Sequence, residues 1–200
     1  MVGAPALLTS MRGARAFAAL LALTAASVLP AQELVIGGTC RDGEPQGAYT
    51  LRAPNGRLRV AGALARGRRT GTFLFWSERG SRIAVIPYDD DRKTGTVAVW
   101  FAPSAPGSDA PRKSEAAYVD NQLHGEKRSW YPNGKPRTRL RYEHGVLVEA
   151  HAFAPSGAAL SEAESRERAR SDVATDEAFY ATLEALVARN SPKCEASVPP

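Results

Sequence analysis

Turn-forming residues recur with a period of 24 residues through the middle of this 200-residue chain, and this period limits its fold more than any other feature. Each motif pairs a turn residue with a glycine four positions later: Gly43 with Gly47, Gly67 with Gly71, Asp91 with Gly95, and Asn121 with Gly125, before the motif fades after Gly145. Glycine, aspartate and asparagine are the residues that tolerate left-handed turn geometry. A period of this length indicates a repeat array built from small supersecondary units.

Two rows of aromatic residues keep the same register. They are Trp76, Trp100 and Trp130, each five residues after a closing glycine, and Tyr88, Tyr118 and Tyr142, with Leu64 at the equivalent place in the first unit. One interval measures 30 residues because a Pro-, Ser- and Gly-rich insert lies around residues 102–115. Large side chains that recur once per unit usually pack the shared core, so we expect both rows to be buried. The alternative is that a row lines an exposed face of the sheet, where its rings could stack on sugars or bases.

The segments between the glycines alternate apolar and polar residues, which is typical of strands. The first strands of the units are predicted at residues 48–53, 72–76 and 96–101, and the second strands at residues 58–64, 83–88, 116–119 and 137–142. The pairs Asn55-Gly56 and Asn133-Gly134 are strong hairpin signals. The sequence therefore predicts a mostly β protein in which about four antiparallel β-hairpins follow in series and bury a common apolar face.

The motif Tyr118-Val-Asp-Asn-Gln-Leu-His-Gly125 and the segment Gly125-Glu-Lys-Arg-Ser-Trp-Tyr-Pro-Asn-Gly134 resemble MORN repeats. The second segment is similar to the bacterial variant found in YwqK-type antitoxin-like proteins. This resemblance covers about residues 40–157. It implies an elongated, curved antiparallel sheet that serves as a scaffold or interaction surface, and it brings no catalytic residues with it.

The N-terminus has the three parts of a secretory signal peptide. Arg12 and Arg15 form a positive region, residues 16–29 form an apolar region, and small residues such as Ala31 offer a cleavage site. We therefore predict a signal peptide over residues 1–31, with Met11 as an alternative start. Residues 32–157 would then hold the repeats and residues 158–200 a helical C-terminal segment. The expected location is the bacterial periplasm or the extracellular space, and the processed chain is not expected to cross a membrane.

Cys40 and Cys194 are the only two cysteines. In an oxidising compartment they have only each other as partners, so a bond between the start and the end of the processed chain is one expectation. Two unpaired thiols are the alternative.

The last 40 residues change in pattern and in charge. Residues 161–200 hold five basic and eight acidic residues, although the whole chain carries a net charge of +5. Residues 161–170 are rich in Glu, Arg and Ala, and predict a solvated helix. Thr175, followed by two acids, then resembles an N-cap, and Phe179, Leu183 and Val187 follow on one helical face. This amphipathic helix is expected to cap the sheet or, alternatively, to bind a partner.

Basic residues cluster near the last repeat. Lys135, Arg137, Arg139 and Arg141 alternate along one predicted strand, which would place all four on the same face, and Lys127 and Arg128 lie one strand earlier. These six residues form a candidate binding surface for an anionic partner. The alternatives are a solvated sheet face or a dock for the acidic segment between Glu162 and Glu184.

Catalytic and metal-binding patterns are weak. His124, His144 and His151 are scattered and are expected to lie in turns or on the surface, and Asp89, Asp90 and Asp91 are expected to be turn residues. The sequence contains no Gly-x-Ser-x-Gly elbow, phosphate loop or Gly-x-Gly-x-x-Gly fingerprint. We therefore predict no enzyme activity, no cofactor and no metal site.

Together these features predict an exported binding or scaffold protein that acts through its repeat surface. The expected partner is another protein or an anionic component of the envelope, and export makes nucleic acid an unlikely ligand. An immunity protein that neutralises a partner enzyme is the alternative, which rests on the antitoxin-like resemblance.

Overall fold

The computed structural model describes residues 33–103 and 110–195, which belong to a unit formed by residues 32–200. The predicted signal peptide and residues 104–109 of the predicted insert lie outside the described residues. Residues 112–115, which were assigned to the insert, begin a strand instead.

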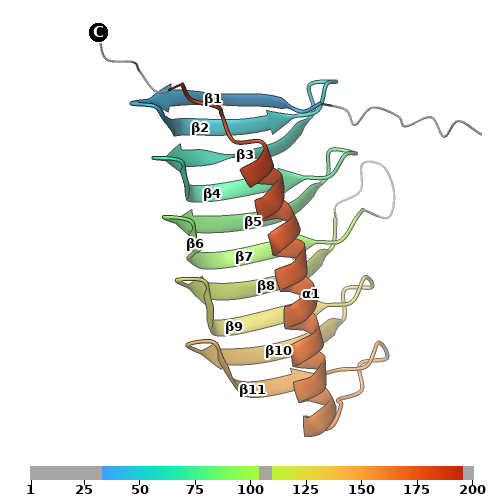
Figure 1. Cartoon of the computed structure of the whole chain (residues 1–200). Helices are drawn as coiled ribbons and strands as arrows, with labels where there is room; N and C mark the ends of the chain where they lie inside the picture. The colour runs from blue at the N-terminus through green and yellow to red at the C-terminus, as the bar shows by residue number, and fades with distance from the viewer. Residues whose placement is uncertain (1–32, 104–109, 196–200) are drawn as a thin grey trace, which may run out of the picture. The chain divides into compact units, whose positions relative to one another are not determined.

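Within the described residues, eleven strands form one antiparallel sheet and one helix crosses it, which confirms the predicted fold class (Figure 1). The strands are β1 (Val35–Arg41), β2 (Glu44–Arg52), β3 (Leu58–Ala65), β4 (Arg68–Trp76), β5 (Arg82–Asp89), β6 (Arg92–Lys93), β7 (Gly95–Trp100), β8 (Arg112–Val119), β9 (Gln122–Trp130), β10 (Pro136–Glu143) and β11 (Val146–Ala152). Their spatial order follows the chain, except that short β6 pairs only with β5. The sheet is therefore a continuous meander of hairpins.

Tight turns lie at the first position of each glycine motif. In every turn both central residues have positive φ: Asp42-Gly43, Arg66-Gly67, Asp90-Asp91, Asp120-Asn121 and His144-Gly145. This is the geometry of the two-residue turn that matches the twist of antiparallel strands. Asn55-Gly56 and Asn133-Gly134 lie in longer connections at the opposite end of the strands, where Ala53 N–H donates to the Arg57 carbonyl over 2.8 Å.

Successive tight turns are hydrogen-bonded to one another. The second turn residue donates its N–H to a carbonyl of the preceding hairpin at 2.8–3.0 Å: Gly67 to Pro45, Asp91 to Arg69, Asn121 to Lys93 and Gly145 to Leu123. Where Asp91 and Asn121 replace glycine, their side-chain oxygens also accept the backbone N–H of Arg69 (2.9 Å) and Lys93 (2.7 Å). These departures from glycine thus add a hydrogen bond between neighbouring hairpins.

The 28-residue helix α1 (Glu162–Arg189) lies across one face of the sheet. Ser161 caps it, and Ser161 and Glu164 form a reciprocal capping box. The prediction of a second N-cap at Thr175 is wrong, because Thr175 lies inside the helix and donates its hydroxyl to the Ser171 carbonyl. Leu183 and Val187 are buried against the sheet, as their spacing predicted.

The two aromatic rows lie on opposite faces. Tyr88, Tyr118 and Tyr142 are buried between the sheet and α1, which confirms their expected role in the core. The three tryptophans are only partly buried, and the expectation that they belong to the core is wrong. Each tryptophan directly follows a residue that faces α1, and alternation along the strand turns its ring to the uncovered face.

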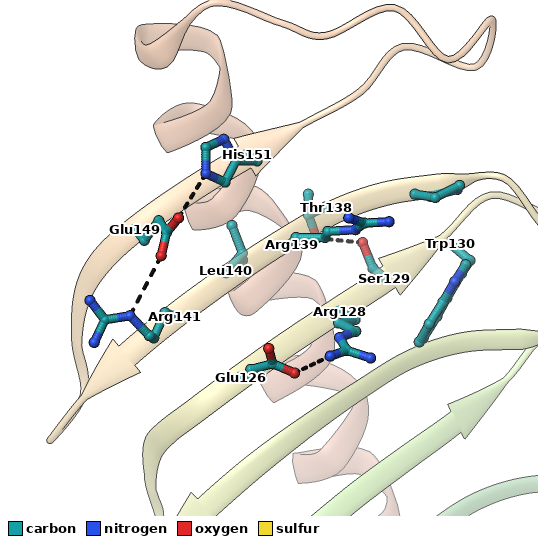
Figure 2. A pocket seen from close by; sticks show the side chains of 11 residues that line it. Glu126, Arg128, Ser129, Trp130, Thr138, Arg139, Leu140, Arg141, Glu149 and His151 are labelled. Atoms are coloured by element: carbon teal, nitrogen blue, oxygen red, sulfur yellow. Dashed lines mark hydrogen bonds and ion pairs between the residues drawn. The ribbon is translucent and has the colours of Figure 1, made fainter.

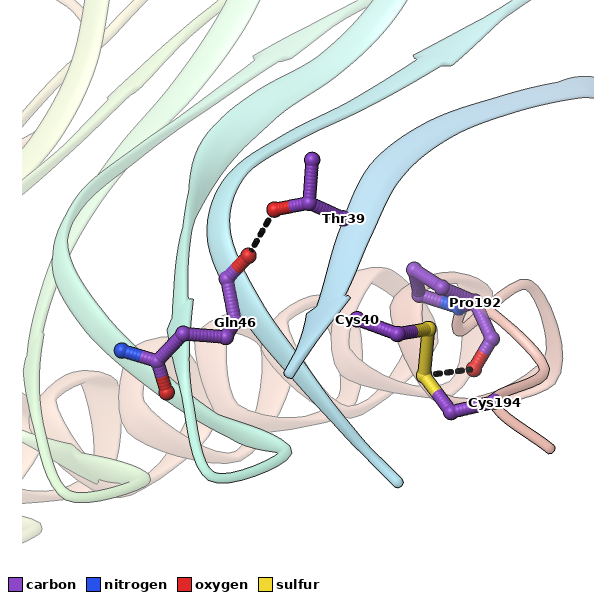
Figure 3. The surroundings of a disulfide bond; sticks show 5 residues. All are labelled: Thr39, Cys40, Gln46, Pro192 and Cys194. Carbon is purple, nitrogen blue, oxygen red and sulfur yellow. Dashed lines mark hydrogen bonds between the residues drawn. A yellow bond between two sulfur atoms is a disulfide. The ribbon is translucent and has the colours of Figure 1, made fainter. Parts of the chain in front are cut away.

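A covalent link joins β1, the first strand of the array, to the C-terminal tail. Cys40 on β1 and Cys194 form a disulfide that joins residues 154 positions apart, which confirms the predicted pairing (Figure 3). Cys40 precedes Leu64 by 24 residues and so holds the place of the tyrosine row on β1, one repeat before Leu64. The tyrosine row faces α1, and α1 ends close to this end of the sheet, where Tyr49 Oη of β2 donates to the Asn190 carbonyl over 3.1 Å.

Removing this link is expected to destabilise the protein. In the chain-entropy account, a bond that closes so long a loop contributes at most about 5 kcal/mol. The variant with Cys40→Ser and Cys194→Ser should therefore unfold at a lower urea concentration than the parent, whereas Lys193→Ser, beside the bond, should not. Equal unfolding midpoints for all three proteins would show that the disulfide does not stabilise the fold.

Buried tyrosines also predict an alkaline transition. Burial raises the pKa of Tyr49 and of Tyr142 to about 12, from an ordinary value near 10. Because the folded state favours the neutral phenol, this stabilisation is complete below pH 10 and is lost between about pH 10 and 12. Absorbance is read immediately after rapid jumps to a series of pH values. The tyrosinate absorbance of the folded protein should appear at higher pH than that of the urea-unfolded protein. Coincident titrations would contradict this.

Candidate functional site

Within the described residues, five ion pairs connect α1 to the sheet. From the beginning of α1 to its end, they join Asp172 to Arg137, Asp176 to Lys127 and to Lys113, Glu177 to Lys93 and Glu184 to Arg69. The five cations come from β10, β9, β8, β6 and β4, so the pairs run along most of the array. Tyr118 Oη also donates to Glu177 over 2.7 Å, and Tyr88 Oη to Glu184 over 3.0 Å.

The pairs differ in burial and alignment. Lys127 is 1% exposed and Asp176 is 4% exposed, so this pair is enclosed between α1 and the sheet. Arg137 binds Asp172 through Nε (3.0 Å) and Nη2 (2.7 Å), and hydrogen bonding to this carboxylate raises the pKa of Arg137. Arg69 Nη1 lies 3.2 Å from Glu184 Oε1 but is not aligned for a hydrogen bond.

The structure divides the six predicted binding residues into three groups. Lys127 and Arg137 face α1, and the Lys135 ammonium donates to the Ser156 carbonyl over 3.0 Å. Arg128, Arg139 and Arg141 are exposed. The prediction that Lys135, Arg137, Arg139 and Arg141 share one face is therefore wrong. A bulge between Pro136 and Thr138 makes Arg137 an extra residue in the ladder and turns it toward α1.

The three exposed arginines line a groove of about 530 Å³ on the face opposite α1, across β9, β10 and β11 (Figure 2). Two of them have carboxylate neighbours. Arg128 pairs with Glu126, and Arg141 lies 2.5 Å from Glu143 and 3.5 Å from Glu149. These are solvent-exposed pairs, which contribute little to stability and are readily exchanged.

The Glu149 carboxylate lies between the side chains of His151 and Arg141 in this groove. His151 Nε2 lies 2.9 Å from its carboxylate on one side, and Arg141 lies on the other (Figure 2). The hydrogen bond from His151 lowers the pKa of Glu149, with Arg141 adding to the effect.

Arg139 differs from its neighbours. Within the described residues, no carboxylate lies within ion-pair distance of its guanidinium, which instead sits 5.9 Å from the ring centre of Phe153. An exposed guanidinium with no acidic partner can donate to a carboxylate or phosphate from outside. Arg139 is therefore the member of the predicted set that is best placed to meet an anion.

The sequence prediction missed a second cationic feature on this face. Arg82 and Arg112 each place their guanidinium 4.4 Å from the ring centre of Trp100. Each arginine pairs across strands with a tryptophan, Arg82 with Trp76 and Arg112 with Trp100. Both arginines stand nine residues before a tight turn, and this shared repeat position is the signal that identifies them.

The histidines and the aspartate run have local roles. The rings of His124, near the start of β9, and of His144, in the next tight turn, are centred 4.8 Å apart, and the His144 N–H donates to His124 Nδ1 over 3.3 Å. Asp90 and Asp91 form a tight turn and pair with Arg68 and Arg69. Across residues 33–103 and 110–195, no three His, Cys, Asp or Glu side chains converge as a metal site would require.

No family model matches the chain, and a search of curated proteins finds no match either. In the part of the chain that the structure describes, no helix has the length and apolar character needed to span a membrane.

Lys127 and Arg128 provide a matched test of the two faces. Lys127→Ala should destabilise the protein by about 3–5 kcal/mol, because it leaves Asp176 buried without its partner. Arg128→Ala, one residue away on the exposed face, should change the stability by less than about 0.5 kcal/mol. Urea unfolding of both variants measures the difference. Similar losses of stability in the two variants would contradict the assignment of Lys127 to the face under α1 and of Arg128 to the opposite face.

Proposed function

We propose that this chain is an exported, non-catalytic binding protein that meets its partner with the face of the repeat sheet opposite α1. The observation that carries the proposal is the division of the basic residues. Lys127 and Arg137 serve the docking of α1, whereas Arg139, with Arg128 and Arg141, stays on the uncovered face. A surface that the fold itself does not use, and that offers an arginine without an acidic partner, suits an anionic partner.

Two further features support export. The disulfide between Cys40 and Cys194 suits an oxidising compartment, and the signal-like pattern of residues 1–31 suits secretion. We place the protein in the bacterial periplasm or outside the cell, with another protein or an anionic envelope component as its partner.

The hairpin meander also supports the resemblance to MORN repeats as a proposal. Its tight turns recur at the motif positions, and its tyrosine row packs the core. In such an array the repeated surface serves recognition rather than chemistry, because each unit repeats packing residues and none brings a catalytic set. Neutralisation of a partner enzyme would be one form of this binding role.

Charge reversal on the two sides of the molecule tests the proposal. The open-face variant carries Arg139→Glu and Arg141→Glu. The control carries Arg166→Glu and Arg170→Glu, two exposed arginines of α1, and has the same change in net charge. Crosslinked capture from envelope fractions should give a partner that the parent and the control retain and that the open-face variant loses by about tenfold or more.

Equal capture by all three proteins would contradict binding through the open face. If the captured partner is an enzyme, its activity should be measured with and without the parent protein. Inhibition by the parent and the control, but not by the open-face variant, would specify the role as that of an immunity protein.

A further inference from the structure

Charges in the groove of Figure 2 are matched across neighbouring strands, with one exception. Arg141 on β10 lies opposite Glu126 on β9 and opposite Glu149 on β11. Arg128 on β9 lies opposite Glu115 on β8. Opposite charges that face each other across strands stabilise a sheet, so these positions serve the fold itself.

Arg139 on β10 is the exception. It lies opposite Arg128 on β9 and opposite His151 on β11, so neither neighbouring strand offers it a negative charge. Its side chain is exposed and lines the groove together with that of Arg128 (Figure 2). Like charges directly opposite each other destabilise a sheet. A sequence that breaks this rule at one position, and obeys it at the neighbouring ones, points to a function for that position.

An anion bound here must satisfy two guanidinium groups at once. Residues directly opposite on adjacent strands have Cβ atoms about 5 Å apart, so Arg128 and Arg139 can reach the same bound group. A carboxylate offers two oxygens and a single negative charge. A phosphate monoester offers three terminal oxygens and a charge of about −1.5 to −2, and each arginine can donate to it through two N–H groups. The opposed arginines therefore favour a phosphate monoester over a carboxylate.

The groove is larger than a phosphate group. Its volume is about 530 Å³, and its wall also contains Pro136 and the partly buried ring of Trp130. Glu126 and Glu149 line the same groove, and a carboxylate keeps acceptor positions free after it has formed one ion pair. An aromatic ring beside hydrogen-bond acceptors suits a sugar, whose C–H groups contact the indole and whose hydroxyls donate to the carboxylates.

We propose that this groove binds a phosphate monoester carried by a sugar at the end of an envelope glycan. The phosphate accepts hydrogen bonds from Arg128 and Arg139, and the exposed pair of Arg128 with Glu126 is exchanged for this contact. The sugar ring lies against Trp130. This inference rests on the proposed function, because it names the ligand of the same face as an anionic envelope component rather than a protein.

Calorimetric titration of the full processed chain tests the proposal. Glucose 6-phosphate and N-acetylglucosamine 6-phosphate are offered free and as the terminal unit of an oligosaccharide. Glucose, inorganic phosphate and an oligoglutamate peptide are the comparators. At least one sugar phosphate should bind in both forms, about tenfold or more tightly than inorganic phosphate, because the sugar adds contacts that the ion alone lacks. Glucose should not bind detectably.

Three variants locate the binding. Arg139→Gln should weaken binding of the sugar phosphate about tenfold or more, because it removes charge-assisted hydrogen bonds. It should not lower the urea midpoint, because it also removes the like charges that face each other. Arg128→Gln should weaken binding in the same way. Arg82→Gln is the matched control, since Arg82 is an exposed arginine of the same face that stacks on Trp100 outside the groove, and it should bind as the parent does.

The inference is overturned if inorganic phosphate or oligoglutamate binds as tightly as the best sugar phosphate, or if only the free monosaccharide forms bind. It is also overturned if Arg82→Gln weakens binding as much as Arg139→Gln. If no sugar phosphate binds while partner capture still depends on Arg139 and Arg141, this inference fails and the proposed function stands. Capture that is unaffected by Arg139→Glu and Arg141→Glu contradicts the proposed function itself.

Discussion

The ion pairs between α1 and the sheet are the interaction on which the rest of the structure depends. A single sheet has two faces, and its apolar row of Tyr88, Tyr118 and Tyr142 must be covered to be buried. The helix that covers it presents carboxylates as well as apolar side chains to the sheet. A buried pair such as Lys127 and Asp176 adds little net stability, because desolvation offsets most of the attraction. It does disfavour other placements, since a helix shifted by one turn would leave both charges buried and unpaired.

Helix length and repeat number follow from this arrangement. Twenty-eight residues of helix span about 42 Å. The ten strands in line from β1 to β11 span about 43 Å at the usual strand spacing. Because α1 runs back along the array, its C-terminal end returns to β1, where Cys40 and Cys194 can meet. Adding one hairpin without lengthening α1 by about six residues would leave part of the tyrosine face uncovered.

The sequence predicted the features that follow from the repeat period. It missed the features that depend on local departures from that period, such as a β-bulge. Turns, hairpins and the tyrosine row follow from spacing alone. Arg137 was assigned to the wrong side because a bulge, which no spacing reveals, shifts it relative to Arg139. Thr175 resembled an N-cap because the acids after it usually mark a helix start. Asp176 is instead tolerated inside the helix by Lys127, a residue of a distant strand. The tryptophans were assigned to the core because periodicity shows that positions are equivalent but not which face they occupy.

The same irregularities explain why the array stops where it does. Gly47, Gly71, Gly95 and Gly125 all have positive φ, but the last unit has Glu149 at this place. A side chain there disfavours continuation of the repeat geometry and puts a charge on the edge strand β11. The outer edge of β11 is also engaged at its last residue, because Leu160 N–H donates to the Ala152 carbonyl and Ala152 N–H donates to Ser165 Oγ. At the other end, Cys40 ties β1 to the C-terminal tail. Because α1 covers one face of the sheet, the described unit leaves the face of Arg139 as its broad uncovered surface.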